Sequence, residues 1–378
     1  MKITVAIDSF KGSMTSIEAG EAAREGILRV YKDAEVEIKP IADGGEGTVD
    51  ALVLGLGGKY KTVKVKNPLG ATIEAKYGIV GETAIMEMAA ASGIALIKRE
   101  ELNPMITTTY GVGEMIKDAI LNGCRSFFIG IGGSATNDGG TGMLSALGFE
   151  FLKADGTKIA NGACELDKIE KIVDTNVIKE LKECTFNIAC DVTNPLCGEF
   201  GASRIFGPQK GASDSDVLIM DKSLEHFGRL TMEKYADADM NYKGAGAAGG
   251  LGFAFLSYLG GKLKSGISLI LDEIGLEDSI KGSDLVITGE GRIDAQTVMG
   301  KAPAGVAGLA KKHNKPVVAF AGGVTKDARV CNSHGIDALF PIVRGITTLE
   351  SAMDNKNARE NMSDTVEQVM RLYKLNDR

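Results

Sequence analysis

The sequence predicts an α/β protein in which a discontinuous parallel-sheet domain is built from both ends of the chain and a second α/β domain is inserted between them. Continuous apolar, β-rich runs occur near both termini, at Ile3–Ile7 and Asp284–Thr288. Such runs are typical of strands that are covered on both faces. Helix-type patterns alternate with these runs, which is the arrangement of βαβ units and a parallel sheet.

In the N-terminal part, the predicted strand Ile3–Ile7 is followed by a helix and a second strand. Thr15-Ser16-Ile17-Glu18 fits a capping box, in which a hydroxyl and a carboxylate bond the free N–H groups of a first helical turn. The next apolar, β-rich run covers Val36–Ile41. We therefore expect a strand–helix–strand unit at the start of the chain.

The C-terminal part repeats the alternation. Apolar residues at helical spacing near the end, from Met362 to Tyr373, predict a closing amphipathic helix. We also expect strands at Asp284–Thr288, Lys315–Ala321 and Ile336–Val343, and a helix at Ala304–His313.

The middle of the chain has shorter strand patterns, at Thr83–Met88, Ser126–Ile131 and Thr185–Ala189, which glycine-rich stretches separate. This change in pattern indicates a separate domain. We therefore expect one domain at 1–65 plus 266–378 and an inserted α/β domain at 66–265.

Composition excludes several partners. The 378-residue chain has a formal net charge of −7, which argues against a nucleic-acid-binding surface. No apolar run approaches the ~20 residues of a membrane-spanning helix, so we expect no membrane partner. Six cysteines without a CxxC pair, and an N-terminus that reaches Asp8 and Lys11 too soon for a signal peptide, favour a cytoplasmic protein. The oligomeric state stays open, with a homodimer as one option.

Polar residues follow three predicted strands of the terminal domain. The carboxyl ends of parallel strands meet at one edge of a sheet, where open α/β folds bind ligands. Surface turns also collect Gly and Asp, but three such loops on one sheet favour a binding site. The residues are Asp8, Ser9 and Lys11 after the first strand, Asp43 and Glu46 after the second, and Glu290, Arg292 and Asp294 after Asp284–Thr288.

A glycine-rich segment of the inserted domain, GIGGSATNDGG at Gly130–Gly140, follows a predicted strand and precedes a predicted helix that starts at Thr141. Free backbone N–H groups and a helix N-terminus together form an anion site. We expect ligand contacts from Gly132, Gly133, Ser134, Thr136 and Asn137.

The inserted domain offers three further candidate regions. Asp191 ends a predicted strand, and Lys210 lies in a rigid turn; either residue could be structural. Gly244–Gly249 matches GxGxxG, but the residues before it are polar and not strand-like, so the dinucleotide fingerprint lacks its context. We interpret it as a turn into a close-packed helix that still faces a phosphate, through Gly246 and Gly249.

Other chemistries lack their motifs. The sequence contains no Walker-type GxxxxGK[ST], no GxSxG and no HRD or DFG set, and its three histidines lack metal-ligand spacing. Carboxylates, cations and backbone N–H groups remain, and these suit phosphoryl transfer, which needs donors around the phosphoryl group and oxygen ligands for Mg²⁺.

Seven motifs, in order along essentially the whole chain, resemble the bacterial glycerate kinase family of the two-domain type. We find no departure at these motifs. They are DSFKG (Asp8–Gly12), ADGGEGT (Ala42–Thr48), GIGGSATNDGG (Gly130–Gly140), CDVTNPL (Cys190–Leu196), FGPQKGA (Phe206–Ala212), GAGAAGGLG (Gly244–Gly252) and VITGEGRID (Val286–Asp294).

The resemblance implies a Rossmann- or flavodoxin-like terminal domain, an inserted domain of restriction-enzyme type, and ATP-dependent phosphorylation of D-glycerate. It favours the 2-hydroxyl, giving 2-phosphoglycerate, over the 3-hydroxyl. The resemblance supplies no firmly assigned catalytic base, so the following roles are our own inference. We expect Lys11 on the γ-phosphate, Asp43 and Glu46, or Glu290, on Mg²⁺, and Arg292 on the glycerate carboxylate, with Asp8, Ser9 and Asn194 nearby. We expect Asp191 or Asp294 as the base.

Three alternatives stay open at this point. The first is a glycerate 3-kinase or another small hydroxy-acid or sugar kinase on the same scaffold. The second is a non-catalytic nucleotide-binding regulator, which the dense set of carboxylates disfavours. The third and weakest is a dinucleotide oxidoreductase.

Overall fold

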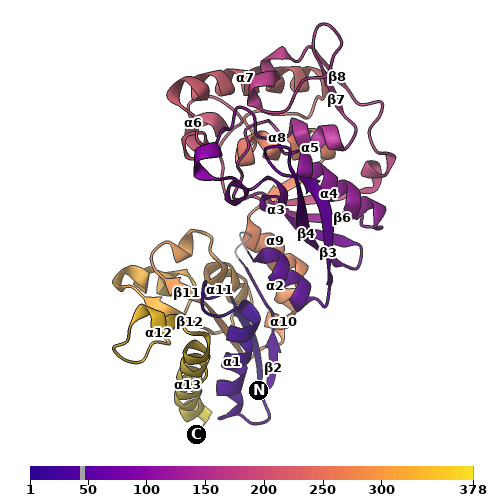
Figure 1. Cartoon of the computed structure of the whole chain (residues 1–378). Coiled ribbons are helices and arrows are strands. Elements are labelled where there is room, and N and C mark those ends of the chain that lie inside the picture. Colours follow the sequence, from indigo (N-terminus) through magenta and orange to yellow (C-terminus); the bar gives the residue numbers. More distant parts are fainter. Residues whose placement is uncertain (43–46, 378) are drawn as a thin grey trace. The chain divides into compact units, whose positions relative to one another are not determined.

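The computed structural model describes residues 1–42 and 47–377, and it divides the chain into two compact units (Figure 1). The first unit comprises 1–43, 50–57 and 267–378, and the second comprises 44–49 and 58–266. On the N-terminal side this division falls earlier than the expected boundary at residue 65. The reason is that β3 (Lys59–Lys66) pairs along its whole length with β4 (Thr72–Val80) of the second unit.

The first unit is built on a five-stranded sheet with the order β13-β12-β11-β1-β2, in which every pairing within the described residues is parallel. β1 lies between β11 and β2, and its residues Ile3, Val5 and Ile7 are fully buried. The strands are β1 (Lys2–Ile7), β2 (Glu35–Ile38), β11 (Leu285–Ile293), β12 (Val317–Val324) and β13 (Ala338–Pro341).

The sheet order reverses between β1 and β11. From β1 the chain goes to β2 on one side, whereas from β11 it goes to β12 and then β13 on the other. Connections that diverge in this way leave a crevice at the carboxyl ends of the two central strands, which is where open α/β sheets bind their ligands.

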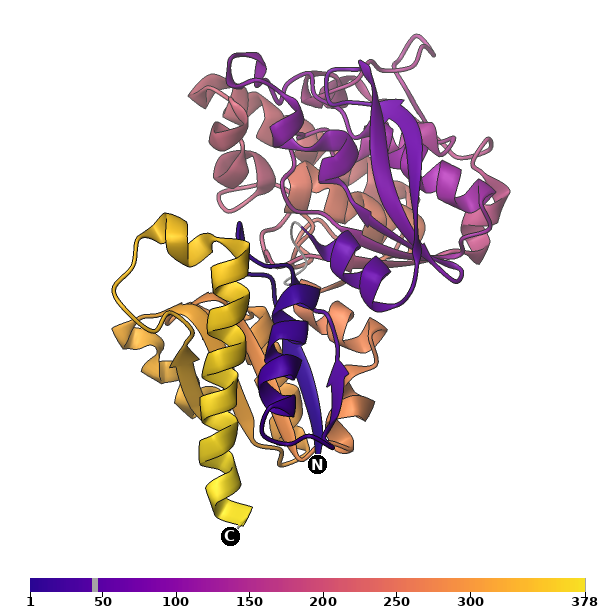
Figure 2. The same cartoon turned by 60° about the horizontal axis from the view of Figure 1, so that its bottom comes forward.

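Helices α1 (Ser16–Leu28) and α13 (Asn355–Tyr373) pack side by side in the first unit, as Figure 2 shows. The capping box expected at Thr15 is confirmed, because its hydroxyl accepts from the N–H of Glu18 while the Glu18 carboxylate accepts from the Thr15 N–H. The other helices of this part are α2 (Thr48–Gly55), α9 (Gly266–Glu273), α10 (Leu276–Lys281), α11 (Ala302–Lys312) and α12 (Leu349–Met353).

The second unit contains a six-stranded mixed sheet with the order β10-β9-β6-β5-β4-β3. Strands β5, β6, β9 and β10 run parallel, while β3 and β4 form an antiparallel edge. Besides β3 and β4, the strands of this sheet are β5 (Thr83–Glu87), β6 (Ser126–Gly130), β9 (Thr185–Ala189) and β10 (Lys262–Lys264). The strands β7 (Glu150–Leu152) and β8 (Lys171–Val173) form a separate two-stranded sheet.

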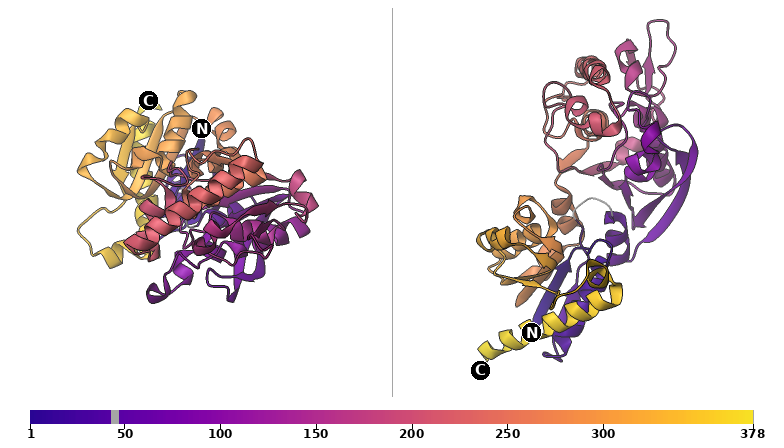
Figure 3. Two further views of the ribbon diagram at one scale, coloured as in Figure 1. Left: turned by 90° about the horizontal axis from the view of Figure 1, so that it is seen from above. Right: turned by 60° about the vertical axis from the view of Figure 1, so that its left-hand side comes forward.

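Helices pack around this sheet over a core that is rich in aromatic side chains, such as the stacked pair Phe127 and Phe186. The long helix α7 is seen lengthwise in the left view of Figure 3. The helices are α3 (Ala89–Ser92), α4 (Tyr110–Leu121), α5 (Thr141–Ala146), α6 (Ala202–Phe206), α7 (Asp214–Lys234) and α8 (Ala247–Leu259). Both units confirm the α/β class with mainly parallel sheets. Across residues 1–42 and 47–377, no helix combines the length and the apolar character needed to cross a bilayer.

One sequence-based boundary is wrong in a way that matters for the site. The strand expected to end at Thr288 continues as β11 to Ile293, because Arg292 and Ile293 still pair with Gly323 and Val324 of β12. Close contact between the strands requires Gly289, since a Cβ there would lie 2.1 Å from the Phe320 carbonyl oxygen. Glu290 and Arg292 therefore lie on a strand rather than in a loop.

Two helical glycines give a matched test of packing. A Cβ on Gly26 of α1 would lie 2.3 Å from the Ser363 carbonyl oxygen of α13, whereas a Cβ on Gly308 of α11 meets no atom within 4 Å. We expect Gly26→Ala to lower the free energy of unfolding by roughly 1–3 kcal/mol through overpacking. Gly308→Ala should raise it by about 0.5–1 kcal/mol. Urea unfolding of both variants checks this, and equal effects would contradict the packing of α1 on α13.

Candidate active site

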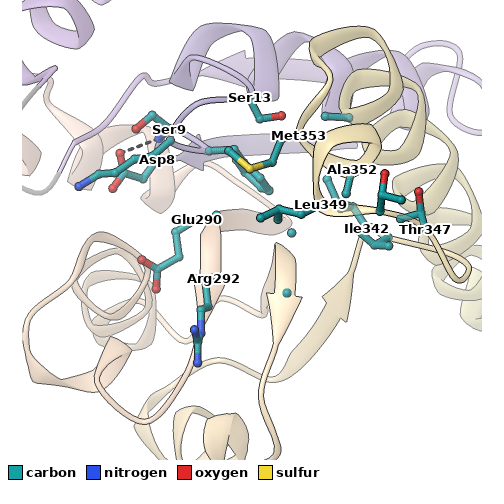
Figure 4. Close-up of a pocket in the computed structure, with 18 of the residues that line it drawn as sticks. Asp8, Ser9, Ser13, Glu290, Arg292, Ile342, Thr347, Leu349, Ala352 and Met353 are labelled. Atoms are coloured by element: carbon teal, nitrogen blue, oxygen red, sulfur yellow. Dashed lines mark hydrogen bonds between the residues drawn. The ribbon is translucent and has the colours of Figure 1, made fainter.

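The first unit contains a cavity of about 730 Å³ at the point where the sheet order reverses (Figure 4). Its walls come from the segment after β1, the end of β11, the Gly322–Gly323 part of β12 and the segment 342–353 with helix α12. The cavity thus lies where the topology of the sheet predicts a ligand.

The segment after β1 follows the sheet and then turns sharply. The N–H of Asp8 donates to the Gly289 carbonyl oxygen at 2.9 Å, and the N–H of Ser9 donates to Asp8 Oδ1 at 2.6 Å. Asp8 is only 7% exposed although it lines the cavity. Lys11 lies at the tip of the following turn with an exposed side chain, which within the described part of the chain makes no hydrogen bond or ion pair.

The end of β11 carries a cluster of charged side chains. Lys301 Nζ lies 3.6 Å from Glu290 Oε2 and 3.9 Å from Asp294 Oδ1. Arg292 Nε lies 3.6 Å from Asp294 Oδ2, and the Arg292 side chain is 70% exposed. The Thr297 hydroxyl donates to Glu290 Oε1 at 2.7 Å. Burial raises the pKa of Glu290, although Thr297 and Lys301 work against this shift.

The structure therefore brings five of the predicted residues to one cavity: Asp8, Ser9, Lys11, Glu290 and Arg292. Asp294 is linked to this group through Arg292 and Lys301, without lining the cavity itself. The predicted residues Asp43 and Glu46 lie outside the described residues.

Sequence reasoning missed Lys301 and the whole segment 342–353 as parts of the cavity. The sequence signal for Lys301 is the dipeptide Gly300-Lys301 directly before a helix. Because this dipeptide is not part of a Walker-type motif, the sequence assigned no role to Lys301. The segment 342–353 carries no motif, and only the pairing of β12 with β13 brings it to this edge of the sheet.

In the second unit, the predicted segment Gly130–Gly140 is organised around Asp138. This fully buried carboxylate accepts from the Thr109 N–H at 2.8 Å, from the Thr109 hydroxyl at 2.9 Å and from the N–H groups of Gly140 and Gly142 at 3.1 and 3.3 Å. Burial raises the pKa of Asp138, and these hydrogen bonds oppose the shift. Asp138 thus acts as the internal support of the segment.

A buried lysine holds the same segment from the other side. Lys210, in the single turn Pro208–Lys210, is 2% exposed, and its Nζ donates to the Thr136 carbonyl oxygen at 2.6 Å. Burial lowers the pKa of Lys210 to about 8, and the negative charge of Asp138 acts in the opposite direction. The two buried side chains together fix the conformation of residues 134–142.

Of the predicted ligand contacts in this segment, three are buried and bonded within the unit. The hydroxyls of Ser134 and Thr136 lie 2.9 Å apart, the Thr136 N–H donates to Ser134 Oγ, and Asn137 Nδ2 donates to Ser203 Oγ. Gly132 and Gly133 are exposed instead. The surface of the segment is therefore backbone.

The glycines of GxGxxG are also packed against the protein itself. A Cβ on Gly246 would lie 2.2 Å from the Pro195 carbonyl oxygen, and one on Gly249 would lie 2.1 Å from that of Thr136. Gly249 has a φ of +69°, so α8 begins with left-handed residues. These glycines permit close backbone packing, as expected from the interpretation of this motif as a turn into a close-packed helix.

The remaining predicted residues of the second unit make local contacts. The side-chain Nδ2 of Asn194 donates to the Phe200 carbonyl oxygen at 2.8 Å, and the backbone carbonyl oxygen of Asn194 accepts from the Gly246 N–H. Asp191 Oδ1 accepts from the Gly266 N–H at 3.0 Å. Among the residues that the structure describes, no group of three or more His, Cys, Asp or Glu side chains could hold a metal ion.

A parallel α/β sheet whose reversal point carries lysines, an arginine and carboxylates has the architecture of a protein that binds small charged ligands at that point. Residues 3–374 match the model of the glycerate kinase family. The chain belongs to the glycerate kinase family and is an enzyme of the kinase class.

Individual relatives cover nearly the full length. The chain is 46% identical to glycerate 2-kinase of Escherichia coli K12, with 93% of each chain covered. It is 47% identical to glycerate kinase of Haemophilus influenzae, with 98% of each covered. The crystal structure of a Salmonella typhimurium LT2 protein, described as "putative glycerate kinase 2", superposes with a TM-score of 0.92 at 42% identity and covers 100% of this chain and 99% of that one.

The buried amine of Lys210 gives a prediction on pH. Its folded-state pKa of about 8 lies below that of an unfolded lysine, so the unfolded chain binds more protons between these values and stability rises with pH there. We expect the free energy of unfolding of the wild type, relative to Lys210→Met, to increase by roughly 1–3 kcal/mol from pH 7.5 to about 10.

Denaturant unfolding at several pH values measures this difference. Lys222→Met is the matched control, because Lys222 is exposed on α7 and should show no such trend. A stability difference between wild type and Lys210→Met that does not change with pH would contradict the buried ammonium group.

Proposed function

We propose that this protein transfers the γ-phosphoryl group of ATP to the 2-hydroxyl of D-glycerate, giving 2-phosphoglycerate and ADP. The observation that carries the proposal is that Lys11, Arg292, Asp8 and Glu290 line one cavity at the reversal point of the sheet. Membership of the glycerate kinase family and the name of the Escherichia coli relative support the same substrate and position.

The charged end of the cavity suits phosphoryl transfer. The transition state spreads negative charge over the transferred group, and preorganised cations stabilise it. Lys11 is an exposed cation at the cavity that makes no ion pair within the described residues, so it is available for the γ-phosphate. Glu290 offers carboxylate oxygens, and Mg²⁺ is usually bound by one or two carboxylates together with substrate phosphates. Glu290 would thus hold Mg²⁺, which would neutralise phosphate charge; Asp43 and Glu46 remain predicted ligands.

Arg292 and Asp294 would handle the acceptor. A guanidinium binds a carboxylate through two parallel hydrogen bonds, so the exposed Arg292 would orient glycerate, with Asp8 and Ser9 beside it. The 2-hydroxyl oxygen would then form a bond to the γ-phosphorus as the bond to the β,γ-bridging oxygen breaks. Asp294, next to Arg292, would take the hydroxyl proton; Asp191 is the alternative base.

The sequence also predicts phosphate contacts for residues of the second unit. The exposed backbone of Gly132 and Gly133 supports anion binding by N–H groups, and the buried Asp138 and Lys210 hold that backbone in place. Direct contacts from Ser134, Thr136, Asn137, Asn194, Gly246 and Gly249 remain predictions of the sequence, as do the cytoplasmic location and a homodimer.

Product identification tests the proposal. Purified protein with ATP, Mg²⁺ and D-glycerate should release ADP and give 2-phosphoglycerate, identified by ³¹P and ¹³C NMR. ADP release is also measured with hydroxypyruvate and short sugars, and D-glycerate should be preferred. A 3-phosphoglycerate product would overturn the assigned position, and preference for a sugar would overturn the substrate.

Lys11→Ala tests the role of the cation at the cavity. We expect kcat to fall by about 10²-fold or more, because stabilisation of the transition-state charge is lost. Stability should stay within about 0.5 kcal/mol, because the side chain is exposed. Steady-state kinetics and thermal unfolding measure both effects. Lys32→Ala, at an exposed lysine before β2, is the matched control. A near-normal kcat in Lys11→Ala would remove Lys11 from the mechanism.

A further inference from the structure

We propose that the apolar end of the cavity in the first unit binds the nucleoside part of the phosphoryl donor, with the base against Leu349, Ala352 and Met353. This inference rests on the proposed function, because it assigns the donor of that reaction to a particular surface. It adds a nucleoside site on a segment that carries no recognisable nucleotide motif.

The cavity has two chemically different ends, which Figure 4 shows. Asp8, Glu290 and Arg292 lie toward one end, where β1 and β11 finish. The other end is formed by apolar side chains from the segment after β13, from α12 and from the first turn of α13. These include Ile342, Val343, Leu349, Ala352, Met353 and Ala358.

The size and polarity of the cavity fit a ligand larger than the acceptor. Its volume of about 730 Å³ lies in the range of sites that enclose whole cofactors or drug-sized molecules, about 300–1,000 Å³. A three-carbon hydroxy acid fills only the charged end and offers the apolar walls nothing to bury. A ligand with a flat apolar ring at one end and a polyanion at the other matches both ends, and a nucleoside triphosphate has this construction.

The side chains at the apolar end are exposed in a way that needs an explanation. Leu349 is 75% exposed and Met353 37% exposed, although both line the cavity. Covering apolar surface contributes about 25 cal/mol per Å², and a methionine thioether makes favourable contacts with aromatic rings. A purine ring against α12 would therefore remove both side chains from water.

Two threonines next to α12 differ in how their hydroxyls are used. The Thr348 hydroxyl accepts from the Ser351 N–H at 3.2 Å and caps α12. Thr347 also lines the cavity, and no hydrogen bond of its hydroxyl occurs in the part of the chain that the structure describes. Its hydroxyl is available to a ribose or to a ring nitrogen.

The charges fix the direction of the donor. Two cations that line the cavity, Arg292 and Lys301, lie beside the carboxylates at the end of β11. A base against α12 thus directs the phosphates toward the end of β11. Gly12 joins the two regions: a Cβ on it would lie 2.8 Å from Met353 Cε, so the turn that carries Lys11 packs against the proposed nucleoside site.

A single introduced tryptophan tests binding without turnover, because the sequence contains no Trp. Leu349→Trp places the sole indole at the proposed base site. We expect saturable changes in its fluorescence with ATP and with ADP, and none with D-glycerate alone. Glu350→Trp is the matched control, since Glu350 is the next residue of α12 and does not line the cavity. If the fluorescence of Leu349→Trp does not change with ATP or ADP although the variant still turns over ATP, the inference is overturned.

A bulky residue at the apolar end gives the second test. We expect Ala352→Phe to raise the KM for ATP by about tenfold, equivalent to ~1.4 kcal/mol, and to leave the KM for D-glycerate within about twofold. Glu350→Phe should change neither. An increase in the KM for glycerate with an unchanged KM for ATP would overturn the inference. If Ala352→Phe does not fold, the tryptophan titration decides.

The two proposals fail separately. If ADP changes the fluorescence of Leu349→Trp but the protein does not phosphorylate D-glycerate, the nucleoside site stands and the proposed reaction is wrong. If the protein makes 2-phosphoglycerate but neither variant responds to nucleotides as expected, the reaction stands and the nucleoside site is wrong.

Discussion

The parallel pairing of β1 with β11 is the constraint on which the architecture of the first unit depends. It joins residues near position 5 to residues near position 287, and it ends at the hydrogen bond between the Asp8 N–H and the Gly289 carbonyl oxygen. Because the chain leaves these two strands in opposite directions, their carboxyl ends stay uncovered. The same pairing therefore buries the centre of the sheet and opens the cavity that holds the charged residues.

The second unit handles charge differently. Lys210 and Asp138 are both buried, and the cost of removing such groups from water is met by hydrogen bonds to the backbone of the glycine-rich segment. Replacing either residue would leave the backbone groups that it binds without their hydrogen-bond partner. Asp138 and Lys210 hold the exposed backbone of the glycine-rich segment in one conformation. Glycine residues alone would leave this backbone free to adopt many conformations.

Patterns that are local in sequence predicted much of this fold. The Thr15 capping box, the strand at Thr185–Ala189 and the alternation near both termini depend on neighbouring residues, and the structure has all three. Local patterns could not predict contacts between segments that are distant in the sequence. Asp138 is held by Thr109, 29 residues away, and Glu290 became part of a strand because β12 supplies partners beyond Thr288. The segment 342–353 has no distinctive composition, so its place at the cavity follows only from tertiary structure.

The discontinuity of the first unit also has a consequence for synthesis on the ribosome. Residues 58–266 of the second unit are continuous and emerge together, and domains generally fold as units while the chain is made. β1 emerges first, but its neighbour β11 follows only after about 280 further residues. β2 is made soon after β1, but the nascent chain must carry β1 without β11 on its other side through most of translation. The side of β1 that faces β11 can therefore be paired only after the C-terminal part of the first unit has been made.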